Sequence, residues 1–201
     1  MLGRVFCLLA GLFLVGCNDS NVTVIDVPSS ILKPIIVSEP ISRQSSAPID
    51  SHRCKIEIIG DSQVGNVLRF AREDAKRNNW NLQWDYVVGT RISFWEKRYQ
   101  PSPDTDLTIV FLGSNDYGGN PNPSTLLSKI DNECIWVGPT NVRGNGKRVN
   151  KILKESTSKC TYVDSLDVPL GDKIHPTFNG AKQWWFNISV LIQQKCNSIH
   201  S

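Results

Sequence analysis

A strand that stops at a Gly-Asp-Ser turn and passes straight into a helix is the feature that most constrains the fold of this chain. Residues 54–59 form a short run rich in β-branched side chains, and Gly60-Asp61-Ser62 follows it. Apolar residues then recur at helical spacing as far as Ala75. A serine in such a turn lies past the carboxyl end of a strand, at the positive end of a helix, where α/β sheets bind ligands. Ser62 is therefore a candidate nucleophile, although turns also use these residue types for conformational reasons alone.

Candidate strands and helices alternate along the rest of the chain. The strands are expected at 54–59, 83–88, 106–112, 134–138 and 160–164, and the helices near 63–77, 123–132, 146–156 and 179–196. Strict alternation predicts a three-layer α/β/α fold around a five-stranded parallel sheet, in the flavodoxin-like order 2-1-3-4-5. Residues 54–201 have the size of one domain with a real core.

The N-terminus indicates export. Arg4 precedes an apolar run from Val5 to Val15, which is far shorter than the roughly 20 residues that span a bilayer. The run ends in Leu14-Val15-Gly16-Cys17, which resembles the bacterial lipoprotein processing box. Residues 1–16 are thus expected to be a lipoprotein signal peptide, and a lipid on Cys17 is expected to anchor the protein to a membrane, facing the periplasm or the cell exterior. The alternative is ordinary secretory cleavage nearby, with Cys17 incidental.

Asn18 bears on the membrane to which the predicted lipoprotein would be sorted. It stands where an aspartate would resemble an inner-membrane retention signal. Outer-membrane sorting is therefore favoured if the source is Gram-negative.

A flexible tether is expected over residues 17–53. This segment is rich in Ser and Pro, and its four prolines are spaced so that neither a helix nor a central strand can run through it. The alternative is that Val22-Thr23-Val24-Ile25 adds an edge strand to the domain, given its β-propensity.

The charge balance bears on possible partners. The chain has 22 Lys and Arg against 19 Asp and Glu, and removal of residues 1–16 leaves 21 against 19. So small an excess predicts no nucleic-acid partner. The oligomeric state stays open.

The cysteines predict two disulfides. One of the six lies in the signal peptide and Cys17 is assigned to lipid, which leaves four in an oxidising compartment. Cys134 and Cys160 begin strands that would be neighbours about 4.8 Å apart. The last helix should bring Cys196 back to the edge where Cys54 begins the first strand. Cys54–Cys196 and Cys134–Cys160 are the expected pairs, and no Cys or His spacing suggests a metal or other cofactor.

Of three histidines, His175 is well placed to act as a base. Pro176 disfavours helical geometry at His175, and Gly171 on the N-terminal side disfavours regular secondary structure. Residues 171–177 are therefore expected to form a loop before the last helix. Asp172 can fold back to accept one ring N–H, which leaves the other nitrogen for a serine. The alternative is a surface loop in which Thr177 caps the helix and nothing more.

Two further residues could stabilise an oxyanion. The third strand ends in Gly113-Ser114-Asn115-Asp116, and strands 1 and 3 should flank the topological switch, so Asn115 would face the same cleft as Ser62. Its amide could donate a hydrogen bond, or the segment could be plain turn chemistry. Gly89, at the end of the second strand, could present a bare N–H or merely end that strand.

Taken together, these blocks resemble the SGNH, or GDSL-type, hydrolases over essentially all of 54–196. They are Gly60-Asp61-Ser62, Gly89, Gly113-Ser114-Asn115-Asp116 and Asp172-Lys173-Ile174-His175, in the order and at the approximate intervals of that family. The resemblance implies Ser62 as nucleophile, His175 as general base and Asp172 as its orienting partner. It also implies an oxyanion hole from the backbone of Ser62 and Gly89 and the side chain of Asn115. Gln63 stands where the family usually has leucine, and the second block lacks its common flanking residues.

The expected activity is that of a serine esterase. The connection at 91–99 is aromatic and charged, so no apolar lid is evident, and Arg91, Trp95, Arg98 and Tyr117 are expected around the cleft. These features favour an ester substrate with a small acyl group, acetyl above all, on an envelope or surface carbohydrate. Lysophospholipase, thioesterase or acyltransferase activity is the alternative within the family. A carbohydrate-binding lipoprotein without turnover is the alternative from another class.

Overall fold

The computed structural model describes residues 53–199. The predicted signal peptide, Cys17 and nearly all of the predicted tether lie outside the described residues. The elements in chain order are β1 (Lys55–Gly60), α1 (Ser62–Arg77), β2 (Asn81–Tyr86), α2 (Ile92–Arg98), β3 (Leu107–Phe111), α3 (Ser124–Leu127), β4 (Glu133–Val137), the 3-10 helix η1 (Val142–Gly144), α4 (Gly146–Ser156), β5 (Thr161–Val163) and α5 (Phe178–Ile199).

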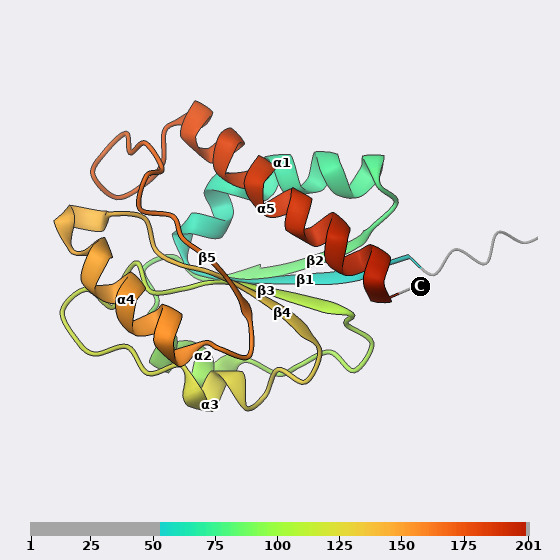
Figure 1. Ribbon diagram of the computed structural model, residues 1–201, viewed down its shortest axis with the longest axis horizontal. Coiled ribbons are helices and arrows are strands. Elements are labelled where there is room, and N and C mark those ends of the chain that lie inside the picture. Colours follow the sequence, from blue (N-terminus) through green and yellow to red (C-terminus); the bar gives the residue numbers. More distant parts are fainter. Residues whose placement is uncertain (1–52, 200–201) are drawn as a thin grey trace, which may run out of the picture. The chain divides into compact units, whose positions relative to one another are not determined.

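The five strands form one parallel sheet in the order β2-β1-β3-β4-β5, which confirms the predicted order. Helices α1 and α5 cover one face, and α2, α3 and α4 cover the other (Figure 1). This is the predicted three-layer fold. Strands β1 and β3 are neighbours, and the helices that follow them, α1 and α3, lie on opposite faces of the sheet, so the topological switch lies at their carboxyl ends (Figure 1).

The core is divided by the sheet into two layers. Ile58 on β1 and Ile109 on β3 point toward α1 and α5, whereas Ile59 and Val110 point toward the opposite helices. Successive strand residues face opposite sides, so a strand buried on both faces reads as a continuous apolar run. All five residues of β3 are buried, as a central strand requires.

Helix α2 was not expected from the sequence. Residues 91–99 were expected to be an aromatic and charged connection, and no helix was predicted there, but Ile92, Trp95 and Tyr99 recur at helical spacing and are all buried. The expectation that Trp95 lies around the cleft is therefore wrong. Its side chain is 0% exposed, and its Nε1–H donates to Thr90 Oγ1 at 3.0 Å. Arg98 instead pairs with Asp85 on β2.

Both predicted disulfides are present. Cys54–Cys196 joins the residue before β1 to the last turns of α5, and Cys134–Cys160 joins β4 to the residue before β5. Each therefore links segments that the strand order brings together. Within residues 53–199, no helix is long and apolar enough to cross a membrane.

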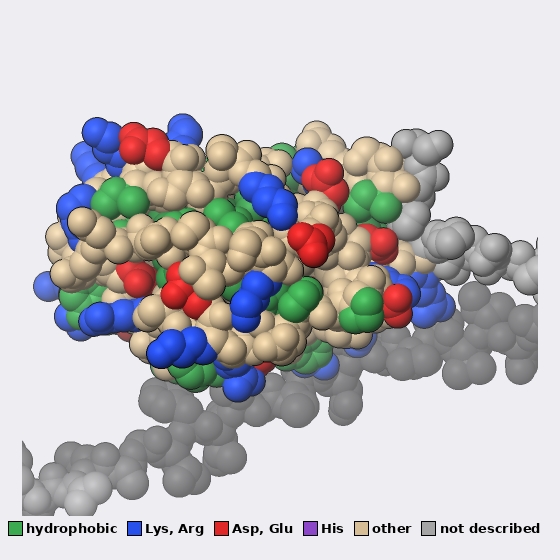
Figure 2. Space-filling view, turned by 90° about the horizontal axis from the view of Figure 1, so that it is seen from below, with side chains coloured by type: hydrophobic (Ala, Val, Ile, Leu, Met, Phe, Trp, Pro, Cys, Tyr) green, Lys and Arg blue, Asp and Glu red, His purple; other side chains and the backbone are tan. Residues whose placement is uncertain are grey.

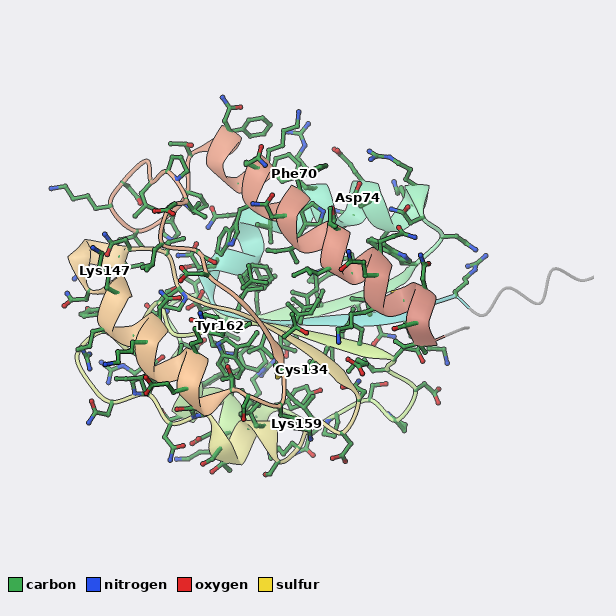
Figure 3. All side chains as sticks on the ribbon, viewed as in Figure 1. Phe70, Asp74, Cys134, Lys147, Lys159 and Tyr162 are labelled. Carbon is green, nitrogen blue, oxygen red and sulfur yellow. A yellow bond between two sulfur atoms is a disulfide. The ribbon has the colours of Figure 1, made fainter. Side chains whose placement is uncertain are left out.

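Helices α1 and α5 pack side by side, as both the ribbon and the side-chain view show (Figures 1 and 3). Trp185 on α5 donates its Nε1–H to Asp74 Oδ2 on α1 at 2.9 Å. On the face that α2 and α3 cover, acidic and basic side chains are interspersed (Figure 2).

Candidate active site

The turn Gly60-Asp61-Ser62, called the nucleophile turn after its candidate nucleophile, is formed by close packing of β1 against β3. A Cβ atom at Gly60 would lie 2.3 Å from the carbonyl oxygen of Phe111, so only glycine fits there. The Asp61 N–H donates to that same oxygen at 3.1 Å. Asp61 then caps α1, since its Oδ1 accepts the Gln63 N–H at 2.9 Å. Ser62 is thereby held as the first residue of α1.

The three predicted triad residues lie in a continuous chain of contacts. His175 Nε2 is 3.0 Å from Ser62 Oγ, and His175 Nδ1 is 2.9 Å from Asp172 Oδ2. Because an ionised carboxylate can only accept, Nδ1 carries the proton that Asp172 receives. Nε2 is then an acceptor, and Ser62 donates its hydroxyl hydrogen to it. This is the arrangement that a general base requires before a serine attacks.

The Asp172 carboxylate is ionised because hydrogen bonds stabilise its charge. Its Oδ1 accepts the N–H groups of His175 at 2.6 Å and of Ile174 at 3.0 Å. These bonds, together with the His175 ring, hold the pKa of Asp172 well below its ordinary value. Asp172 can therefore orient the His175 ring throughout the neutral range.

Backbone contacts hold the loop at residues 170–176, called the histidine loop, in place. The Gly171 N–H donates to the His175 carbonyl at 2.8 Å, and Leu170 pairs with Pro176 across the base of the loop. Thr177 does cap α5, because its Oγ1 accepts the Gly180 N–H at 3.0 Å. The loop thus ends in the expected helix cap and also places His175 against Ser62.

Asn115 lies at the nucleophile turn but already uses both of its amide hydrogens. Its Nδ2 donates to Asp61 Oδ2 at 2.9 Å and to the Thr90 carbonyl at 3.0 Å. An oxyanion would have to share or replace one of these acceptors. The structure therefore places Asn115 in the site, and its role as an oxyanion donor stays a prediction.

Asp61 is a buried carboxyl group at the centre of this arrangement. Its side chain is 0% exposed, and burial raises its pKa to about 7. The hydrogen bonds from the Gln63 N–H and the Asn115 amide oppose that rise. The sequence analysis did not predict this cap, although an Asp directly before a helix is a common N-cap. The second bond of Asp61, to a residue 54 positions away, had no local signal in the sequence.

Gly89 lies on the connection after β2, beside the same turn. The Val87 N–H donates to the Gly60 carbonyl at 3.0 Å, and Thr90 accepts from Asn115. Gly89 is exposed with a φ of 75°, a conformation that favours glycine. Within residues 53–199, neither its N–H nor that of Ser62 donates to a protein acceptor. Both are thus available to an oxyanion, and these roles too remain predictions.

Metal ligands do not gather in the described part of the chain. No group of three or more His, Cys, Asp or Glu side chains between residues 53 and 199 could hold a metal ion. The groups that the described residues do bring together are the Ser62 hydroxyl, the His175 ring and the backbone N–H donors of Ser62 and Gly89.

The sequence matches no protein-family model and no curated protein. The fold does match solved structures. A proposed platelet activating factor from Streptococcus pneumonia is 12% identical, with a TM-score of 0.52 over 70% of this chain and 86% of that one. A protein from Slackia heliotrinireducens, proposed to be an SGNH hydrolase, is 11% identical, with a TM-score of 0.52 over 66% of this chain and 95% of that one. The described part of this chain therefore has the SGNH hydrolase fold.

Proposed function

We propose that this protein is a serine esterase of the SGNH type. The observation that carries the proposal is the contact chain from Ser62 Oγ through His175 to Asp172, at 3.0 and 2.9 Å. A loop that served only to cap α5 would not need to bring a histidine ring to the serine of a distant turn.

The geometry supports a two-step reaction. As Ser62 Oγ forms a bond to the ester carbonyl carbon, its proton passes to His175 Nε2 and the carbonyl electrons move onto oxygen. The unpaired N–H groups of Ser62 and Gly89 are the donors available to that oxyanion. His175 then returns the proton to the leaving alcohol as the carbon–oxygen bond breaks. Water, deprotonated by His175, releases the acyl group and restores Ser62.

Asp172 stabilises the charge that His175 acquires. The imidazolium would form just before the N-terminus of α5, where the helix dipole disfavours a positive charge. The ionised Asp172 carboxylate, held by two backbone N–H groups, opposes that effect.

The surroundings of the site favour a polar substrate. A hollow of about 350 Å³ has a mostly polar lining, with Arg91, Asp116 and Asn122 among its side chains. Asp116 follows Asn115 in the chain, and Ser62 and His175 do not line this hollow, so it could hold only a part of the substrate away from the reacting ester. Such a hollow suits the hydroxyl groups of a carbohydrate better than an alkyl chain. This supports removal of small acyl groups, chiefly O-acetyl, from an envelope or surface carbohydrate.

A second hollow, of about 370 Å³, has aromatic walls but lies elsewhere. It runs between α1 and α5, where Phe70 and Asp74 lie (Figure 3), and neither Ser62 nor His175 lines it. It is therefore not an acyl groove of the proposed reaction centre.

A series of acyl esters tests the substrate proposal. Values of kcat/KM are compared for acetyl, butyryl, octanoyl and palmitoyl esters of one alcohol, all below their micelle-forming concentrations. A long chain gains about 0.8 kcal/mol per buried methylene only where a groove can bury it. We expect kcat/KM to be highest for acetyl, and a maximum at octanoyl or beyond would favour a lipid esterase instead.

We also propose that the enzyme acts at the cell envelope. The support is the sequence of residues 1–17, which favours a lipoprotein anchored through Cys17 and facing the periplasm or the exterior. Two disulfides between distant segments are consistent with export to an oxidising compartment.

A further inference from the structure

Gln63, the residue after the candidate nucleophile, links α1 to the histidine loop. Its side chain is 1% exposed, and its Nε2–H donates to the carbonyl of Ile174 at 3.0 Å. Ile174 immediately precedes His175 in the chain. The leucine that the family usually has at this position could not form this bond. The glutamine that replaces it here therefore makes a contact with the Ile174 carbonyl that the usual residue cannot make.

The Gln63 side chain is itself held at its other end. Its Oε1 accepts from Asn66 Nδ2 at 3.5 Å, and the same amide donates to the Ser62 carbonyl at 3.1 Å. The Gln63 N–H is fixed on the Asp61 cap. The donor that reaches Ile174 is therefore fixed in position relative to Ser62, since every one of these contacts belongs to the first turns of α1.

The histidine loop has few other anchors close to the reacting atoms, and one of them is the Arg143 N–H, which donates to the Lys173 carbonyl at 3.2 Å. Asp172 and Lys173 are exposed, and Lys173 has a φ of 69°, in the left-handed region that costs energy for a side chain. Ile174 O accepts a second, longer bond from Thr140 Oγ1 at 3.4 Å. Two side-chain hydrogen bonds join α1 to this loop within residues 53–199. One links Ser62 to His175, and the other links Gln63 to Ile174.

We propose that Gln63 is a positioning residue, which sets the distance between His175 Nε2 and Ser62 Oγ by holding the Ile174 carbonyl. The inference rests on the proposed function, because it concerns the same triad. Without the Gln63 bond the loop keeps its backbone contacts but loses its link to the helix that carries the nucleophile. A displacement of about 1 Å at a reacting group can lower a rate by roughly 100-fold.

The test compares Gln63→Met with Thr140→Val. Methionine keeps the length and volume of glutamine and removes both the donor to Ile174 and the acceptor of the long Asn66 bond. The valine variant removes the other bond to the same carbonyl without touching α1. We expect Gln63→Met to lower kcat on an acetyl ester, and the rate of Ser62 labelling by a fluorophosphonate, by roughly 10-fold or more with little change in KM. Thr140→Val should have a smaller effect.

Combining Gln63→Met with His175→Ala separates positioning from a general loss of structure. If Gln63 acts through His175, the methionine should not slow labelling further once the histidine is absent. An equal slowing in both backgrounds would overturn the proposal. Gln63→Leu serves as a second variant if the methionine variant does not fold, as judged by thermal unfolding.

Crystal structures of the wild type and of Gln63→Met test whether Gln63 sets the His175–Ser62 distance without relying on an activity assay. We expect the His175 Nε2 to Ser62 Oγ distance to exceed 3.5 Å in the variant, and an unchanged distance of 3.0 Å would contradict the proposal. A wild-type protein that is neither labelled nor active would overturn the proposed function. The distance would then still decide whether Gln63 positions the loop.

Discussion

Asp61 shows how a single side chain can serve two elements at once. Its Oδ1 caps α1 and its Oδ2 accepts from Asn115, so the nucleophile turn and the end of β3 are held by one carboxylate. The contacts among Ser62, His175 and Asp172 could be predicted because Ser, His and Asp are recognisable by type and local context. The bonds of Asn115 to Asp61 and of Gln63 to Ile174 could not, because they span 54 and 111 residues and depend on the packed register of the fold.

Replacement of Asn115 by alanine tests its predicted role. We expect kcat to fall by roughly 100-fold or more with a modest change in KM, because an oxyanion donor acts chiefly in the transition state. The variant also leaves Asp61 with one acceptor unpaired, which should cost about 1–3 kcal/mol of stability. Kinetics are therefore measured below the unfolding temperature of the variant. An unchanged kcat would show that Asn115 only holds the turn.

The raised pKa of Asp61 predicts a pH dependence of stability. Between its ordinary pKa of 3.8 and its folded value of about 7, the folded state keeps a proton that the unfolded state has released. The free energy of unfolding should therefore fall as pH rises through this window, by about 4 kcal/mol from this group. The lowered pKa of Asp172 acts in the opposite direction, but its effect lies below about pH 4.

Urea unfolding of the wild type and of Asp61→Asn, at pH 4.5 and 7.5, measures this contribution. Asparagine caps helices as well as aspartate does but carries no charge. The free energy of unfolding should fall less between pH 4.5 and pH 7.5 in the variant than in the wild type. The difference between the two falls should be most of the roughly 4 kcal/mol assigned to Asp61. Equal falls in the two proteins would assign the pH dependence elsewhere, for example to the raised pKa of Glu57 or Asp116.

At the scale of elements, the alternation of strands and helices was enough to predict the sheet order. Parallel strands need crossover connections, and few arrangements of five such units bury both faces. Boundaries were less accurate: β2 begins at Asn81, two residues before its predicted start, and α3 ends at Leu127 instead of near 132. Helix α2 was missed because seven residues give only two helical turns of pattern.

The two disulfides should differ in their contribution to stability. Cys54–Cys196 closes a loop of 142 residues and Cys134–Cys160 one of 26. Loss of chain entropy in the unfolded state predicts contributions of about 5 and about 3.5 kcal/mol respectively. Urea unfolding of the two double-alanine variants should show the larger loss for Cys54 and Cys196. The reverse ranking would contradict the entropic explanation.

At the scale of the whole molecule, the predicted anchor lies at the opposite end of the sequence from the histidine loop and outside the described residues. Cys17→Ser should yield protein that is unprocessed or not anchored, as measured by membrane fractionation and mass spectrometry of the N-terminus. Cys7→Ser, within the predicted signal peptide, is the matched control and should be processed and anchored normally. A Cys17→Ser protein that fractionates with membranes and has the wild-type N-terminus would refute lipidation.

The central claim is that Ser62 is the nucleophile of an esterase. Its most direct test is labelling of residues 53–201 with a fluorophosphonate, followed by peptide mapping, in the wild type, Ser62→Ala and the exposed control Ser124→Ala. We predict a single labelled peptide containing Ser62 in the wild type and the control. In Ser62→Ala we predict no labelling and loss of acetyl-ester turnover, with unchanged thermal unfolding. Turnover that persists in a folded Ser62→Ala protein would contradict the claim.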